Sequence, residues 1–142
     1  MVCVSPEKLA KEVERLLEFN PQVYMPTKGD SMRPFIIGED DLVAVCKPPK
    51  EYRKGFVVLA RTLDRRVVMH RVVAIGKEYL DLMGDANLYG RERCRRSDVV
   101  AIADYIIKKD GRKHYINSER QLRMWRFWYW LRPVRKWLLR LM

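Results

Sequence analysis

Residues 66–75 read RVVMHRVVAI, and this run decides the fold class. Five of its ten residues are Val or Ile, whose branched side chains pack well on a pleated sheet. Successive side chains of a strand point to opposite faces, so His70 shares a face with Val68 and Val72, and Arg71 lies on the other face. The run therefore predicts a strand that places a histidine among apolar neighbours.

Four other runs in the middle of the chain have the same character, namely residues 42–46, 56–61, 79–83 and 98–107. Turn-forming sequences rich in Pro, Gly and Asp separate them. The connections are too short to contain crossover helices, so neighbouring strands are expected to be antiparallel. The sequence predicts a mainly β (α+β) fold built on an antiparallel sheet.

Both ends of the chain show helical patterns. In residues 5–19, Ser5 suits the N-cap and Pro6 the first helical position, and apolar residues recur at helical spacing. In the C-terminal region, Ser118 and Gln121 match a capping box, which predicts a helix that Pro133 interrupts. The sheet is therefore expected to have an N-terminal helix and a C-terminal helical tail.

The composition indicates one globular domain. The chain has 142 residues, of which 48% are hydrophobic, and carries a net charge of +11. The three cysteines form no metal-ligand spacing, so no metal site is expected, and free thiols suit a reducing compartment. The N-terminal residues do not resemble a signal peptide, and no apolar run reaches about 18 residues. We expect a cytoplasmic protein that associates at most peripherally with a membrane.

The charge is concentrated in residues 118–142, which hold seven basic residues and one acidic residue. Trp125, Phe127, Trp128, Tyr129 and Trp130 are interleaved with these arginines. Three interpretations remain open. The tail is a helix packed on the domain or on a second copy in a homodimer, an interfacial helix on an anionic membrane surface, or a stacking platform for single-stranded nucleic acid. Nucleic acid is the least favoured of these partners.

Three residues have the chemistry of a serine-hydrolase site. Ser31 lies in Gly29-Asp30-Ser31-Met32-Arg33-Pro34, where Gly29 lets the backbone approach a substrate closely. His70 is suited to act as a general base because an ordinary histidine is mostly neutral at pH 7. Asp85 follows a predicted strand and can orient His70 as a third member. Each residue can also have a purely structural role. Ser31 would then be an ordinary turn serine, His70 a core residue with satisfied hydrogen bonds, and Asp85 a residue that caps the backbone of its own turn.

Four motifs occur in the order Ser31-Met32-Arg33-Pro34, then residues 38–45 (GEDDLVAV), then His70-Arg71-Val72-Val73, then Gly84-Asp85-Ala86-Asn87. Together they resemble the superfamily that unites type I signal peptidases with self-cleaving phage and SOS-response repressors. The resemblance covers roughly residues 24–107. A histidine at the base position is similar to the archaeal and endoplasmic-reticulum signal peptidases, whereas Gly29-Asp30 before the serine is similar to the repressors.

The resemblance implies a coiled, partial β-barrel of antiparallel strands and a serine endopeptidase that cleaves a leader or extended peptide. Ser31 would be the nucleophile, its backbone N–H would contribute to the oxyanion hole, and His70 would be the general base. Gly29, Asp30 and Met32 would line the substrate and oxyanion region. No cofactor is implied. The expected regions are an N-terminal amphipathic helix (1–23), a signal-peptidase-like catalytic domain (24–117) and the basic aromatic tail (118–142).

The chain also departs from the family pattern. The archaeal and reticulum enzymes carry a further acidic pair after the Gly-Asp-Asn element, where this chain reads Leu88-Tyr89-Gly90-Arg91. A third catalytic member is therefore expected to be Asp85 or to be absent. Signal peptidases have a transmembrane anchor, and none is expected in this sequence. The self-cleaving repressors have a scissile small-residue-Gly bond ahead of the serine, and residues 1–30 contain no Ala-Gly or Cys-Gly pair, so repressor-type autocleavage is not expected. The alternatives to a peptidase are a catalytically weak or inactive peptide-binding member of the same fold and a basic protein that associates with membrane or nucleic acid.

Overall fold

The computed structural model describes residues 5–26, 41–86, 90–131, 134 and 140. These residues form two α-helices, eight strands and a short 3₁₀ helix. Their bounds are α1 Pro6–Leu17, β1 Val23–Pro26, β2 Leu42–Cys46, β3 Val57–Arg61, β4 Val67–Ile75, β5 Tyr79–Met83, β6 Glu92–Arg95, η1 Arg96–Asp98, β7 Val99–Ile107, β8 Lys113–Tyr115 and α2 Glu119–Trp130.

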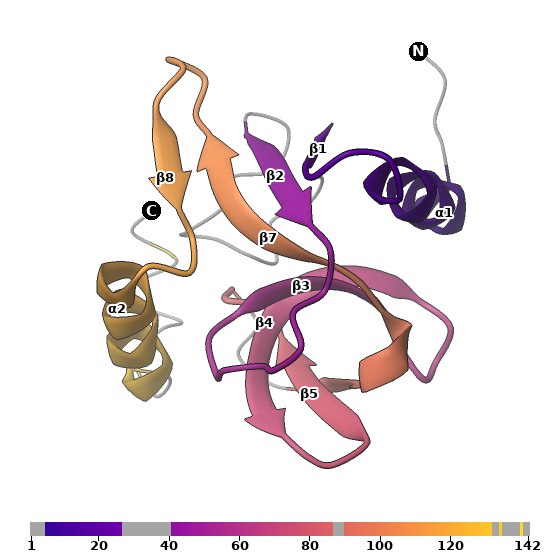
Figure 1. Ribbon diagram of the computed structural model, residues 1–142. Coiled ribbons are helices and arrows are strands. Elements are labelled where there is room, and N and C mark those ends of the chain that lie inside the picture. Colours follow the sequence, from indigo (N-terminus) through magenta and orange to yellow (C-terminus); the bar gives the residue numbers. More distant parts are fainter. Residues whose placement is uncertain (1–4, 27–40, 87–89, 132–133, 135–139, 141–142) are drawn as a thin grey trace.

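The eight strands form one antiparallel sheet in the order β1-β2-β7-β3-β4-β5-β6, with β8 paired to β7. The long strand β7 joins the two halves of the sheet, because one part of it pairs with β3 and the other with β8. The pairing register shifts in β2, β3 and β4, and such irregularities bend strands and increase their twist. The sheet is curled into a half-barrel (Figure 1). The prediction of a mainly β, antiparallel fold with a helix at each end is confirmed.

Helix α1 closes one side of the main core. The Ser5 hydroxyl accepts a hydrogen bond from the Lys8 backbone N–H at 3.3 Å, as the N-cap pattern predicts. Ala10, Val13 and Leu17 are buried in a cluster with side chains of β1, β2, β3 and β7. The N-terminal helix is therefore part of the same core as the sheet.

Helix α2 packs at the other side of the molecule (Figure 1). Ser118 caps it by accepting from the Gln121 N–H at 3.3 Å. Its inner face buries Leu122, Trp125 and Trp128, and Trp125 packs with side chains of β4 and β5. Gly55 makes this packing possible, because a Cβ at that position would lie 2.6 Å from Leu122 Cδ2. Of the three interpretations of the tail, the structure confirms packing on the domain for residues 119–130.

Three strands of the sheet, β1, β6 and β8, were not predicted from the sequence. Each has only three or four residues. β1 ends in a proline, and the sequence of β6 is ERCR. Alternation over so few residues is not distinguishable from a loop pattern, and charged side chains and proline are typical of edge strands.

Candidate active site

The predicted nucleophile Ser31 lies outside the described residues, as do Gly29, Asp30 and Met32. The structure describes the two other predicted members, His70 and Asp85. Both are buried, His70 in β4 and Asp85 in the turn that follows β5.

His70 lies in β4 opposite Val58 of β3, and it shares a face with the apolar cluster that contains Val58 and Val72. Its ring Nδ1 is 3.1 Å from Glu92 Oε2, and the two side chains are only 8% and 11% exposed. Glu92 begins β6, two strands away from β4, with β5 between them. The curl of the sheet brings the imidazole and the carboxylate together.

The contact with Glu92 fixes the chemistry of the imidazole. A carboxylate only accepts hydrogen bonds, so Nδ1 carries a hydrogen and donates it to Glu92. In the neutral ring Nε2 then holds the lone pair. A general base needs this tautomer, and the carboxylate also stabilises the imidazolium that forms when Nε2 takes up a proton. The second oxygen of Glu92 lies 3.6 Å from Arg66 Nη2.

Asp85 does not contact His70 in any of these interactions; its carboxylate is paired with Arg71. Its two carboxylate oxygens accept hydrogen bonds from Arg71, Nε to Oδ1 at 3.0 Å and Nη2 to Oδ2 at 2.6 Å, and both side chains are 1% exposed. Arg71 also donates to the Gly55 carbonyl at 2.9 Å and lies over the Trp125 ring. The Asp85 carbonyl accepts from Trp128 Nε1 at 2.6 Å. Asp85 therefore serves as the counter-ion of the residue next to His70 and as a docking point for α2.

The sequence predicts that a third member is Asp85 or is absent, whereas in the structure the carboxylate beside His70 Nδ1 is that of Glu92. Glu92 is not evident from the sequence for two reasons. It begins a strand that the sequence does not predict, and it directly follows residues 88–91, where the archaeal and reticulum enzymes have their acidic pair. One signal could have found it. In the sequence ERCR, Glu92 alternates with Cys94, which is fully buried in the same cluster as Val72, so both side chains point to the face that carries His70.

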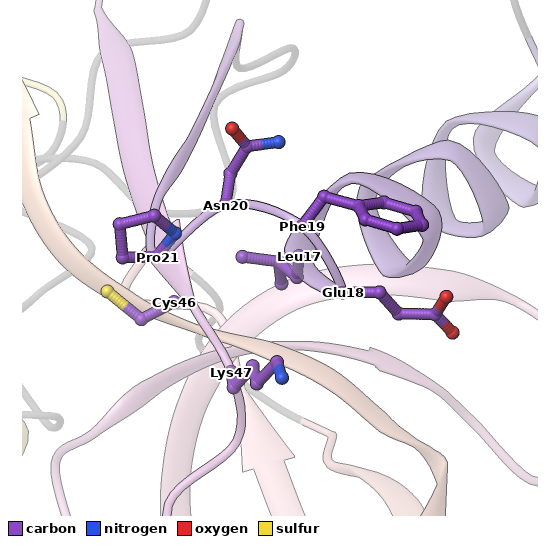
Figure 2. Close-up of a pocket in the computed structure, with 7 residues that line it drawn as sticks. All are labelled: Leu17, Glu18, Phe19, Asn20, Pro21, Cys46 and Lys47. Carbon is purple, nitrogen blue, oxygen red and sulfur yellow. The ribbon is translucent and has the colours of Figure 1, made fainter.

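A surface pocket of about 450 Å³ lies at the C-terminal end of α1 (Figure 2). It is lined by Leu17, Glu18, Phe19, Asn20, Pro21, Cys46 and Lys47. The lining includes none of the predicted catalytic residues. Cys46 is half-buried here, with Gln22 Nε2 3.8 Å from its sulfur. Cys46 is thus partly exposed beside a pocket, in contrast to Cys94, which is buried in the core.

The two described cysteines are expected to differ strongly in reactivity. Burial raises the pKa of the Cys94 thiol to about 11, and burial also raises the pKa of Cys46 above its ordinary value of 9.0. Only the thiolate reacts, so at pH 8 ionisation alone makes Cys94 about 100-fold less reactive than an ordinary thiol. In a Cys3→Ser background, iodoacetamide should modify Cys46 in the folded protein and both thiols after denaturation.

Peptide mass spectrometry measures the two rates separately. The rate at Cys46 should reach half of its maximum at a pH above 9.0, because burial raises the pKa of this thiol above that value. Modification of Cys94 in the folded protein as fast as that of Cys46 would contradict the burial described for it.

Among the described residues, no three His, Cys, Asp or Glu side chains are grouped so that they could hold a metal ion. Within the same part of the chain, no helix has the length and apolar character needed to cross a bilayer.

Comparison with known proteins does not identify a family for this chain. No protein-family model matches the sequence, and a search of curated proteins gives no significant match.

Proposed function

We propose that the chain is a serine peptidase of the signal-peptidase-like type, in which Ser31 is the nucleophile, His70 the general base and Glu92 the residue that orients the base. The observation that carries the proposal is the buried contact between His70 Nδ1 and Glu92 Oε2 at 3.1 Å. A histidine held by a carboxylate at one ring nitrogen is the arrangement that activates a serine in triads on unrelated folds.

The proposed reaction follows from these roles. The Ser31 hydroxyl attacks the carbonyl carbon of a peptide bond while His70 Nε2 takes its proton. The imidazolium, stabilised by Glu92, then gives that proton to the leaving amine, and an acyl-enzyme remains. Water, activated by the same base, hydrolyses the acyl-enzyme and restores the serine. The backbone N–H of Ser31 stabilises the oxyanion, with Gly29, Asp30 and Met32 beside the substrate.

The fold supports the same proposal at a coarser level. The curled, antiparallel half-barrel agrees with the coiled β-barrel that the resemblance implies, and we propose that it belongs to the signal-peptidase and SOS-repressor type. His70-Arg71-Val72-Val73 lies within β4, and Gly84-Asp85 directly follows β5. Two of the four motifs that carry the resemblance therefore lie on a strand of the site or directly after one.

A fluorophosphonate probe tests the proposal, because it reacts covalently with activated serines. The folded wild-type protein should be labelled, and labelling should be lost in both Ser31→Ala and His70→Ala. The matched controls Ser97→Ala and His114→Ala change a residue of the same type elsewhere in the chain and should label like the wild type.

Circular dichroism shows whether the wild-type protein is folded. If the folded wild type is not labelled, the proposal that the chain is a serine peptidase is wrong. Binding of an extended peptide without any labelling would then favour the catalytically inactive, peptide-binding alternative.

A further inference from the structure

The outward face of α2 carries large apolar side chains in solvent. Phe127 is 62% exposed, Trp130 is 74% exposed and Met124 is 45% exposed. The Phe127 and Trp130 rings are stacked with their centroids 6.4 Å apart. The inner face of the helix already packs on the domain through Leu122, Trp125 and Trp128, so the helix can contact a partner without leaving the sheet.

The same helix presents positive charge beside these rings. Arg120, Arg123 and Arg126 are exposed, and no carboxylate of the described residues lies within ion-pair distance of them. The acidic residue of the helix, Glu119, is paired with Arg53 at 2.8 Å. The outward face of α2 therefore combines exposed aromatic rings with exposed guanidinium groups.

We infer that the outward face of α2 binds the surface of an anionic phospholipid bilayer. Phe127 and Trp130 lie at the boundary between headgroups and acyl chains, and Arg120, Arg123 and Arg126 contact lipid phosphates. Tryptophan favours this depth because its ring is apolar and its N–H is polar. Anionic lipid attracts the arginines electrostatically, and the two contributions together hold an amphipathic helix flat on a membrane.

The position of α2 favours a bilayer over the other anionic partner, single-stranded nucleic acid. Nucleic-acid platforms combine stacking rings with a groove that follows the phosphate backbone. Here helix α2 lies at the edge of the molecule (Figure 1), and the rings of Phe127 and Trp130 on it are largely exposed. The outward face of a single helix with interleaved rings and arginines suits a flat surface. The inference concerns a different part of the chain from the Ser31 site and does not depend on it.

Vesicle flotation of the full chain tests the inference. The protein should float with vesicles of phosphatidylcholine and phosphatidylserine at 7:3 and bind at least tenfold more weakly to phosphatidylcholine alone. Phe127→Ser/Trp130→Ser and Arg123→Gln/Arg126→Gln should each weaken binding to the anionic vesicles at least tenfold.

Two control variants carry changes of the same kind at the opposite side of the molecule. Phe19→Ser removes an aromatic ring that is 77% exposed, and Lys8→Gln/Lys11→Gln removes two exposed charges from α1. Both controls should bind the anionic vesicles like the wild type, and all variants should keep the thermal stability of the wild type.

Three results would overturn the inference. One is unchanged vesicle binding by Phe127→Ser/Trp130→Ser. A second is binding to a single-stranded oligonucleotide, lost in that variant, without vesicle binding by the wild type. The third is a dimer in sedimentation experiments that the same variant dissociates, again without vesicle binding.

Discussion

Replacing Glu92 by glutamine is expected to slow the reaction of Ser31 with a fluorophosphonate or an ester substrate by about 10³-fold to 10⁴-fold. Glutamine has nearly the shape of glutamate but is neutral, so it does not stabilise the imidazolium. Its amide N–H₂ can also donate to His70 Nδ1, which moves the ring proton to Nε2 and leaves the base in the wrong tautomer. The measurement is the second-order rate constant of labelling by the wild type and the variant.

Two variants separate this effect from a general loss of structure. Glu78→Gln makes the same change at an exposed position and should leave the rate constant unchanged. Arg66→Gln removes the cation 3.6 Å from Glu92 without touching the His70 contact, and it should change the rate less than tenfold. Equal rates for Glu92→Gln and the wild type would mean that the His70–Glu92 pair serves the fold alone.

Replacing Arg71 by methionine is expected to destabilise the protein by about 3–5 kcal/mol. The substitution leaves the Asp85 carboxylate buried without its bidentate partner, and it also removes the donor to the Gly55 carbonyl. An uncompensated buried charge is among the largest effects a single substitution has. Urea unfolding measures the change, and a lowering of Tm by roughly 10 °C should accompany it.

Arg93→Met is the matched control for this prediction. Arg93 donates to Asp81 at 2.8 Å, but its side chain is 58% exposed, and exposed ion pairs contribute about 1 kcal/mol or less. If both variants lost a similar free energy of unfolding, burial of the Arg71–Asp85 pair would not explain the effect of Arg71→Met. A loss below about 1 kcal/mol for Arg71→Met would contradict it as well.

The sequence was sufficient for the strands that carry a long apolar pattern. β2 and β5 begin and end at the predicted residues, and β4 and β7 start one residue later than predicted. These strands are buried on at least one face, so hydrophobicity marks them along their whole length. The short edge strands β1, β6 and β8 bury few side chains, and their pairing depends on partners that are distant in the sequence.

The candidate site was only partly predictable for a related reason. Alternation along β4 correctly separates His70 from Arg71. The partner of each is set by the curl of the sheet and by the chain after β5, which periodicity does not describe. Asp85 and Glu92 are both carboxylates that follow β5. Alternation with Cys94 points Glu92 to the face of His70, whereas the pairing of Asp85 with Arg71 depends on the path of the chain after β5.

The way in which α2 packs on the domain could also not be predicted from the sequence. Its cap and its helical period are visible in the sequence, but five consecutive large side chains at 127–131 (FWYWL) do not reveal which of them face the domain. The structure buries Trp128 against Asp85 and exposes Phe127 and Trp130. Burial of Leu122, Trp125 and Trp128 and the hydrogen bond from the Trp128 ring to the backbone after β5 together set this orientation.

The most direct test of the central claim is the mass of one tryptic peptide after reaction with a fluorophosphonate. Trypsin cuts poorly before proline, so residues 29–50 remain together as GDSMRPFIIGEDDLVAVCKPPK, in which Ser31 is the sole hydroxyl-bearing residue. We predict that this peptide carries the phosphonyl group in the folded wild-type protein and lacks it in His70→Ala. A phosphonyl group on any other peptide, or the same modification in both proteins, would contradict the assignment of Ser31 and His70.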